Sequence, residues 1–300
     1  MRNKEQEDKL VCVLIVSYNF EPWIEKCIES IQASTIKSSI LVVDNKSSDF
    51  TCAIIKEKYP EVSLITNKEN VGFGAANNIG MKQITDNGYK YAFLLNQDAR
   101  IEPDTIEKLI KVADNHPEYG IISPIHLNGK GDSTDSGFYH YTNIKDRQDA
   151  LSQANEVITY DFVNAAMWVI SVEVWKEVGG FAKIFSHYGE DVNWTQRALN
   201  IGYKTGVVTN AFGYHDRENR QPSRERFFYS EFVYFLTEAV NPLHSDVKAF
   251  AYSILASVKK AAKSLLKGRT NDAKEYISIA NKLIKMSDEI KITRRETNVR

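Results

Sequence analysis

The chain has 300 residues, of which 43% are hydrophobic and 26% charged. These fractions are ordinary for a soluble globular protein and exclude collagen-like, low-complexity and largely disordered classes. The formal net charge is −1, but residues 245–300 carry +7 and the first 244 residues carry −8. The acidic body argues against nucleic acid as the main partner, whereas the basic tail suits an anionic membrane surface.

No apolar run approaches the roughly 18 residues that a membrane span needs. The three cysteines are odd in number and lie in apolar or helical contexts, which favours reduced thiols over disulfides. The polar start of the chain has no signal-peptide core. We therefore expect a cytoplasmic protein.

Short apolar runs alternate with amphipathic segments over the first half of the chain. Strands are predicted at Val11–Val16, Ile40–Val43, Ser63–Thr66 and Tyr91–Leu95. Helices are predicted at Pro22–Ala33, Asp49–Tyr59, Ala75–Thr85 and Pro103–Asn115. Because these strands are continuously apolar, the order predicts an α/β fold with a mostly parallel sheet, covered by helices on both faces.

The second half of the chain is less regular. Strands are predicted at Ile121–Pro124, Asp161–Ile170 and Thr205–Val208, and helices at Val172–Val178 and Glu190–Leu199. A polar, exposed loop is predicted from Asn128 to Asn155. Only helices are predicted after Ser223. One of them carries an apolar stripe of Phe250, Ile254, Val258, Ala262 and Leu265, with lysines opposite.

Polar side chains follow each of the first four predicted strands. They are Ser17-Tyr18-Asn19, Asp44-Asn45, the segment from Asn67 to Gly74, and Asn96-Gln97-Asp98. Ligands of open parallel sheets bind at the carboxyl ends of the strands. The sequence therefore predicts a ligand site at this edge.

Five motifs occur in one order along the chain. They are Val16-Ser17-Tyr18-Asn19, residues 42–49, residues 70–80, Leu94–Asp98 and Tyr188–Val192. Together, over residues 10 to 220, they resemble family 2 glycosyltransferases of the GT-A fold, and in particular the rhamnosyltransferase-like branch.

The resemblance implies a GT-A domain with a Rossmann-like sheet over residues 1–222, followed by a C-terminal helical appendage at residues 223–300. Its donor half would cover about residues 10–120 and its acceptor half about residues 121–222. The activity implied is inverting, metal-dependent transfer of a sugar from a nucleotide-diphosphate donor to a hydroxyl group.

Within the resemblance, Asp44 contacts the nucleoside and the Ser17-Tyr18-Asn19 turn contacts base and ribose. The further donor-binding residues implied are Asn45, Gly72, Asn78, Asn96 and Gln97. Physically, the Tyr18 ring can stack on a pyrimidine, while the Asp44 carboxylate accepts hydrogen bonds. A different interpretation of Asp44 is that it caps the following helix. Gly72 lies in a glycine-rich segment that enters a helix, where backbone N–H groups can approach a phosphate. Alternatively, the glycines only let this helix pack closely on the sheet.

Asn96-Gln97-Asp98 occupies the position of the family's metal-binding Asp-x-Asp signature, with Asn96 in place of the first Asp. The resemblance implies Mg²⁺ or Mn²⁺ as cofactor, held by Asp98 and by His215. With one carboxylate, metal affinity should be weak without the nucleotide. The alternative interpretation of His215 is a hydrogen-bonded structural residue without a metal. Three arginines follow His215 and could bind phosphates: Arg217, Arg220 and Arg224. The alternative is that they lie in a solvated loop.

The adjacent carboxylates of Glu190 and Asp191 open a predicted helix. The resemblance makes Asp191 the catalytic base, with Glu190 holding the acceptor or orienting the helix. The alternative is a favourable interaction with the helix dipole. The segment Phe162–Trp168 resembles the family's acceptor-side strand. Ala182 departs from the Asp that usually follows Gly-Gly-Phe, which bears on acceptor specificity.

The resemblance thus implies a glycosyltransferase that uses dTDP-rhamnose or a UDP-hexose and a glycan or lipid-linked acceptor, in surface polysaccharide synthesis. The alternatives are a catalytically degenerate carbohydrate- or nucleotide-binding protein and a sugar-phosphate nucleotidyltransferase. The basic C-terminal helices would lie peripherally at the inner face of an anionic membrane, pack on their own domain, or form a homodimer contact.

Overall fold

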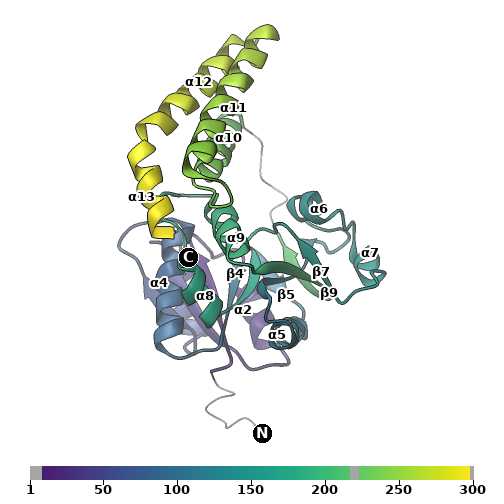
Figure 1. The fold of residues 1–300 in the computed structure, drawn as a ribbon. Coiled ribbons are helices and arrows are strands. Elements are labelled where there is room, and N and C mark those ends of the chain that lie inside the picture. Colours follow the sequence, from purple (N-terminus) through teal and green to yellow (C-terminus); the bar gives the residue numbers. More distant parts are fainter. Residues whose placement is uncertain (1–8, 217–222, 298–300) are drawn as a thin grey trace. The chain divides into compact units, whose positions relative to one another are not determined.

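A computed structural model describes residues 9–216 and 223–297 of the chain. The described residues form two compact units. The sheet unit comprises the described parts of Met1–Glu177 and Gly202–Asn219, and the helical unit those of Val178–Ile201 and Arg220–Arg300. Figure 1 labels their elements.

The sheet unit is built on one nine-stranded sheet, with strand order β3-β2-β1-β4-β8-β6-β9-β5 and β7 paired with β9. The strands are β1 (Val11–Ser17), β2 (Ser39–Asp44), β3 (Ser63–Thr66), β4 (Tyr91–Asn96), β5 (Ala99–Ile101), β6 (Tyr119–Asn128), β7 (Val157–Tyr160), β8 (Met167–Ser171) and β9 (Lys204–His215). The first four run parallel, and β8 is antiparallel to β4 and β6.

Helices cover both faces of the sheet (Figure 1). The helices of this unit are α2 (Ile24–Gln32), α3 (Thr51–Lys58), α4 (Phe73–Asp86), α5 (Thr105–Asn115), α6 (Ser136–Thr142), α7 (Arg147–Leu151) and α8 (Val172–Val178). Val13 of β1 packs in one apolar core with Ile28 of α2 and Leu109 of α5. Leu14 points to the opposite face, because side chains alternate along a strand. There it lies so close to α4 that a Cβ on Gly80 would come within 2.3 Å of its Cδ1 atom.

The predicted fold class is confirmed, but four predictions in the second half had wrong boundaries. The expected strand Ile121–Pro124 is the longer β6. The expected strand Asp161–Ile170 is β8, and β7 is a separate strand before it. The expected strand Thr205–Val208 extends to His215. The expected exposed loop contains α6 and α7, because Phe138, Ile144 and Ala150 are buried and hold it against the sheet.

The helical unit consists of α9 (Glu190–Asn200), α10 (Arg224–Ala239), α11 (Asp246–Leu266), α12 (Thr270–Lys285) and α13 (Ser287–Thr297). Its apolar core joins Phe185, which precedes α9, to Phe235 of α10 and Leu283 of α12. The buried Arg294 of α13 donates to the carbonyl of Asn241 at 2.7 Å, which fixes the last helix to the turn after α10.

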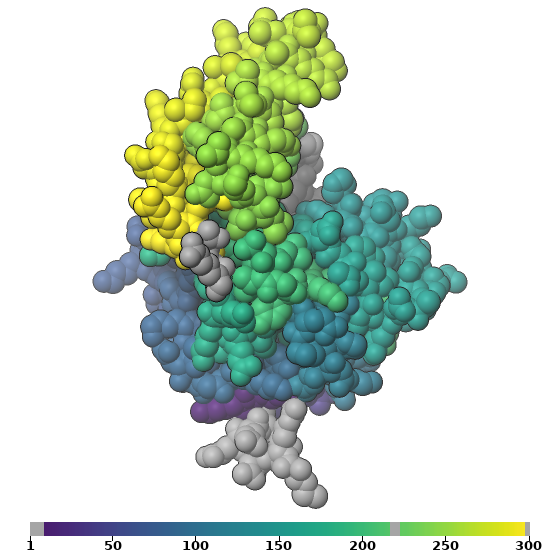
Figure 2. Space-filling view, in the orientation of Figure 1, coloured from purple at the N-terminus to yellow at the C-terminus, as the bar shows by residue number. Residues whose placement is uncertain are grey.

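The buried face of α11 differs from the predicted apolar stripe. Its buried residues are Ala249, Ser253, Ser257 and Ala261. Small side chains let two helices approach closely, and the Ser257 hydroxyl donates to the Tyr276 carbonyl of α12 at 2.7 Å. Val258, Ala262 and Leu265 of the apolar stripe are exposed on α11, which lies among the yellow-green atoms of Figure 2.

Within the described ranges, none of the helices combines the length and the apolar character needed to cross a bilayer.

Candidate functional site

The ends of β1 and β2 form the floor of the predicted donor site. Ser17 pairs in register with Asp44, and both side chains are buried. The Ser17 hydroxyl donates to Oδ1 of Asp44 at 2.8 Å, and the Ser47 backbone N–H donates to Oδ2 at 2.8 Å. Asp44 therefore stabilises its own turn and not α3, whose first backbone N–H, that of Thr51, donates to Oδ1 of Asp49 at 3.1 Å. These bonds hold the carboxylate in one orientation at the strand end.

The Ser17-Tyr18-Asn19 turn is held by the neighbouring strand ends. The Tyr18 backbone N–H donates to Oε1 of Gln97 at 2.8 Å, and Nε2 of Gln97 donates to the Tyr18 carbonyl at 3.2 Å. Asn19 has a left-handed φ of 52°, and its side chain accepts from the Ser48 N–H at 2.9 Å. With the backbone fixed in this way, the Tyr18 ring remains 48% exposed. It is therefore available to stack on a ligand.

Asn45 links β2 to the start of α4. Its Nδ2 donates to the Gly72 carbonyl at 3.2 Å, and its Oδ1 accepts from Asn67 at 2.9 Å. Gly72 has a φ of 84° and precedes the first residue of α4 without a side-chain cap. Asn78 lies half-buried in the second turn of that helix.

The predicted metal ligands come together where β4 ends and β9 ends. Nε2 of His215 lies 3.3 Å from Oδ1 of Asp98 and 3.3 Å from Nδ2 of Asn96. The His215 side chain is fully buried, and its Nδ1 has no hydrogen-bond partner among the described residues. Residues 9–216 and 223–297 contain no cluster of three or more His, Cys, Asp or Glu side chains that could hold a metal.

This donor set fits a divalent cation only as part of a larger complex. One carboxylate and one imidazole supply two ligands, whereas Mg²⁺ requires about six. The remaining ligands would be phosphate oxygens and water. The pair thus fits a cation that arrives with a nucleotide.

A second histidine, which sequence reasoning missed, lies behind His215. The His126 ring is buried, stacks on Phe138 with centroids 4.6 Å apart, and lies 6.4 Å from the ring of His215. Its Nε2 is 2.8 Å from the Ser123 hydroxyl. The only sequence signal was a lone histidine within an apolar strand, which usually indicates a structural role.

Of the three arginines considered for phosphate binding, only Arg224 lies within the described residues. Arg224 forms ion pairs with Asp272 at 2.9 Å and Glu275 at 3.0 Å on α12, so its guanidinium is already engaged. Arg217 and Arg220 lie outside the described residues.

Glu190 and Asp191 begin α9 in the helical unit, after a strained turn. Tyr188 and Gly189 both have left-handed backbones, with φ of 67° and 88°. Glu190 is buried, and its Oε2 has no partner in the part of the chain that the structure describes. Asp191 is half-buried, with Oδ1 accepting from the Val192 N–H at 2.8 Å.

The two carboxyl groups differ in their environments. Burial, together with the neighbouring charge of Asp191, raises the pKa of Glu190 to about 8. At neutral pH these two effects favour the protonated form of Glu190. Neighbouring carboxyl groups in different environments can take different roles in acid–base chemistry.

Arg197 is a positioning residue that the sequence analysis did not single out. It lies buried in α9 and donates to the carbonyls of Val178 at 2.7 Å and Gly180 at 2.6 Å. Burial lowers its pKa to about 10. Ala182, which follows this segment, packs in the apolar core of the helical unit. The two hydrogen bonds of Arg197 therefore hold the Gly179-Gly180 segment against α9.

The acceptor-side segment predicted at Phe162–Trp168 lies beside β4. The Asn96 backbone N–H donates to the Ala166 carbonyl at 2.8 Å, and Met167 pairs with Leu95. Small residues therefore neighbour Asn96.

Comparisons with known proteins give a consistent result. Residues 12–179 match the model of the family "Glycosyl transferase family 2". The chain is 23% identical to N-acetylglucosaminyl-diphospho-decaprenol L-rhamnosyltransferase of Mycobacterium tuberculosis, covering 68% of this chain and 75% of that protein. It is 26% identical to dTDP-rhamnosyl transferase RfbF of Shigella flexneri, over 56% of each chain.

Two solved structures share the fold. The S. aureus TarS 1–349 complex with UDP-GlcNAc superposes with a TM-score of 0.60 at 14% identity, covering 93% of this chain and 81% of that one. The complex of GalNAc-T7 with UDP, GalNAc and Mn²⁺ has a TM-score of 0.58 at 14% identity, covering 77% of this chain and 48% of that one.

The raised pKa of Glu190 predicts the pH dependence of one substitution. Between pH 4.5 and about 8 the unfolded chain ionises at this residue while the folded chain does not, so ionisation favours unfolding as pH rises. Glu190→Gln removes this effect. We expect the Tm of Glu190→Gln, relative to that of the natural chain, to rise by at least about 2–4 °C between pH 5 and pH 8.5.

Differential scanning calorimetry measures this difference. The control is Glu289→Gln on α13, which replaces an exposed carboxylate of the same unit. A constant Tm difference across this pH range would show that Glu190 ionises at an ordinary pKa.

Proposed function

Because the chain belongs to glycosyl transferase family 2, we propose that it transfers a sugar from a nucleotide diphosphate to an acceptor hydroxyl, with inversion at the anomeric carbon. The observation that carries the proposal is the convergence of polar side chains at the ends of β1, β2 and β4. Ser17 bonds to Asp44, Gln97 holds the Tyr18 turn, and Asp98 faces His215. This matches the expected position of a nucleotide site in an open parallel sheet.

The donor nucleoside would lie on the Ser17-Tyr18-Asn19 turn. The exposed Tyr18 ring would stack on the base, and the preoriented Asp44 would accept from the ring N–H or a ribose hydroxyl. Asn45, Gly72 and Asn78 would line the donor site at the start of α4. The names of the two rhamnosyltransferase relatives favour dTDP-rhamnose as donor. The fold shared with TarS keeps a UDP-hexose as the second candidate.

Asp98 and His215 would hold Mg²⁺ or Mn²⁺, whose charge would stabilise the departing nucleoside diphosphate. Asn96 and Gln97 would complete this side of the donor site. His215 is buried beside Asp98, which fixes its ring for this role. Asn96 contributes no charge, so donor and cation would bind together.

Asp191 would act as the base. Its carboxylate would take the proton of the acceptor hydroxyl while that oxygen attacks the anomeric carbon and the bond to the diphosphate breaks. Glu190, whose protonated form is favoured by burial, would hold the start of α9.

Nucleotide binding is tested by thermal shift with UDP, dTDP, GDP and NAD, each with and without Mn²⁺. We expect one pyrimidine diphosphate to raise the Tm, and Mn²⁺ to increase that shift. Asp98→Asn should abolish the increase due to Mn²⁺ and keep the shift due to nucleotide alone. A chain stabilised by NAD alone, or by none of the four, would contradict the proposal.

Catalysis is tested by Asp191→Asn. We expect transfer from a radiolabelled donor to fall by at least about 10³-fold, with the nucleotide thermal shift unchanged, because the substitution removes the base but not the donor site. Glu190→Gln should retain more activity than Asp191→Asn. Transfer unaffected by Asp191→Asn would contradict the role of Asp191 as base. Nucleotide binding without any transfer by the natural chain would favour a binding protein, and formation of nucleotide sugar from sugar phosphate would favour a nucleotidyltransferase.

The acceptor would be a glycan or lipid-linked saccharide of surface polysaccharide synthesis, which would place the protein peripherally at the inner face of the membrane. The name of the M. tuberculosis relative, which includes a diphospho-decaprenol, supports this assignment. On α11, Val247, Leu255, Leu265 and Leu266 are 81%, 67%, 57% and 90% exposed. Exposed lysines on this helix and directly after it, Lys259, Lys263 and Lys267, complement an anionic bilayer.

Membrane contact is tested by flotation with vesicles of phosphatidylglycerol and phosphatidylcholine. The double variant Leu255→Ser, Leu266→Ser should float at least about tenfold less than the natural chain. Insertion of the two leucine side chains into the bilayer would contribute about 3–6 kcal/mol to binding. Leu151→Ser, at an exposed leucine of the sheet unit, is the control. Equal flotation would contradict membrane contact, and a loss of dimer on gel filtration would assign the face to a homodimer.

A further inference from the structure

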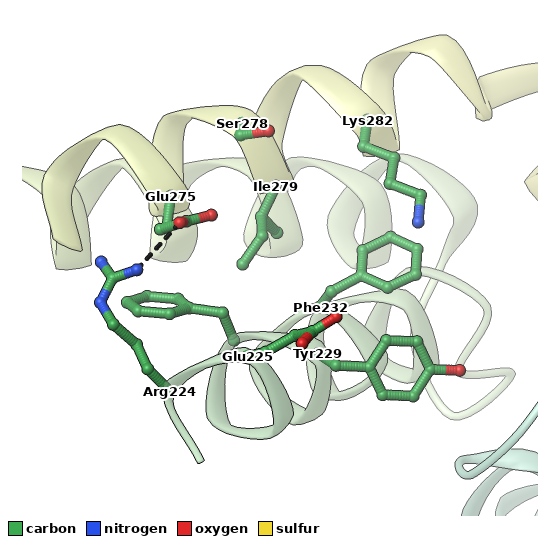
Figure 3. Close-up of a pocket in the computed structure, with 9 residues that line it drawn as sticks. Arg224, Glu225, Tyr229, Phe232, Glu275, Ser278, Ile279 and Lys282 are labelled. Atoms are coloured by element: carbon green, nitrogen blue, oxygen red, sulfur yellow. Dashed lines mark hydrogen bonds and ion pairs between the residues drawn. The ribbon is translucent and has the colours of Figure 1, made fainter. Parts of the chain in front are cut away.

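The helical unit contains a pocket of about 490 Å³ between α10 and α12 (Figure 3). Its floor is apolar and largely aromatic, because the buried residues Phe228, Phe232 and Ile279 line it. Polar and charged side chains form the rim. They are Arg224, Glu225, Tyr229, Glu275, Ser278 and Lys282.

The charges of the rim balance, and both cations are engaged. Arg224 pairs with Asp272 and Glu275, and lies 4.6 Å from the ring centroid of Phe228. Nζ of Lys282 lies 3.7 Å from the ring centroid of Phe232. Two cations and two carboxylates therefore leave the lining with no net formal charge. This composition suits an uncharged ligand better than a phosphate.

The pocket is joined to the turn that precedes the proposed base. The Tyr229 hydroxyl donates to the His187 carbonyl at 2.8 Å and lies 3.3 Å from the Ser186 hydroxyl. The Tyr188 ring lies 6.5 Å from that of Tyr229. A residue of the pocket wall is thus in contact with the segment that leads into Glu190.

We propose that this pocket is an acceptor subsite that binds a neutral pyranose ring of the acceptor glycan. The apolar face of a pyranose would pack on the rings of Phe228 and Phe232. Its hydroxyls would donate to the carboxylates of Glu225 and Glu275 and exchange hydrogen bonds with Ser278. The assignment rests on the proposed function, in which Asp191 of the same unit receives the acceptor hydroxyl.

Direct binding is measured by saturation-transfer NMR with the methyl glycosides of L-rhamnose, D-glucose, D-galactose and N-acetyl-D-glucosamine. Ser278→Trp places an indole at the rim and should weaken binding of the preferred glycoside at least about tenfold. Asn281→Trp is the matched control, since it adds the same ring at an exposed position of α12 that does not line the pocket. It should bind like the natural chain.

Two results would overturn the subsite. One is the absence of saturation transfer to all four glycosides, and the other is equal affinity in Ser278→Trp and Asn281→Trp. Binding of octyl phosphate in place of the glycosides would assign the pocket to the lipid part of an acceptor, and so also overturns it. Each variant is checked for an unchanged Tm.

The same samples separate this proposal from the transferase proposal. The nucleotide thermal shift should be the same in Ser278→Trp as in the natural chain. Glycoside binding that Ser278→Trp weakens in a chain that binds no nucleotide would support the sugar pocket and reject the transferase. Nucleotide binding without glycoside binding would reject the pocket alone.

Discussion

The register of β1 between β2 and β4 is the constraint on which the sheet unit depends. Ser17 lies opposite Asp44 on one side, and Val16 lies opposite Asn96 on the other. β1 is packed on both faces, so a shift of one residue would exchange the side chains that face α2 and α4. On the α4 side the observed register places Leu14 against Gly80, where an added Cβ would not fit. Core packing thereby determines which polar residues meet at the strand ends.

The polar strand ends of the proposed donor side could be predicted because their signals are local. Each strand is a short apolar run, and each is followed directly by its polar residues, as with Asp44 after β2. The long β9 could not be predicted in this way. Its polar middle and Gly213 interrupt the apolar pattern, and its extent depends on pairing with β5, β6 and β7. Such pairings join residues far apart in sequence, which no local window contains.

The helical unit shows the same limit. The apolar stripe of α11 suggested its buried face, yet the helix packs through Ser253, Ser257 and Ala261. Helix packing selects the face that allows close approach, and this depends on the partner α12. The raised pKa of Glu190 and the buried Arg197 likewise depend on burial within the folded unit. The sequence placed Glu190 and Asp191 at a helix start but could not distinguish their protonation states.

The turn at Tyr188–Gly189 has a consequence for how such chains can diverge. A Cβ at Gly189 would lie 2.7 Å from Cγ1 of Val233 and 2.9 Å from Oγ1 of Thr237. The turn therefore packs directly against this wall of α10. Substitutions along that wall and in the turn must then be compatible with each other. Helices exchanged between related proteins would have to carry the matching turn with them, and inheritance of the C-terminal segment is thereby linked to inheritance of the residues around Asp191.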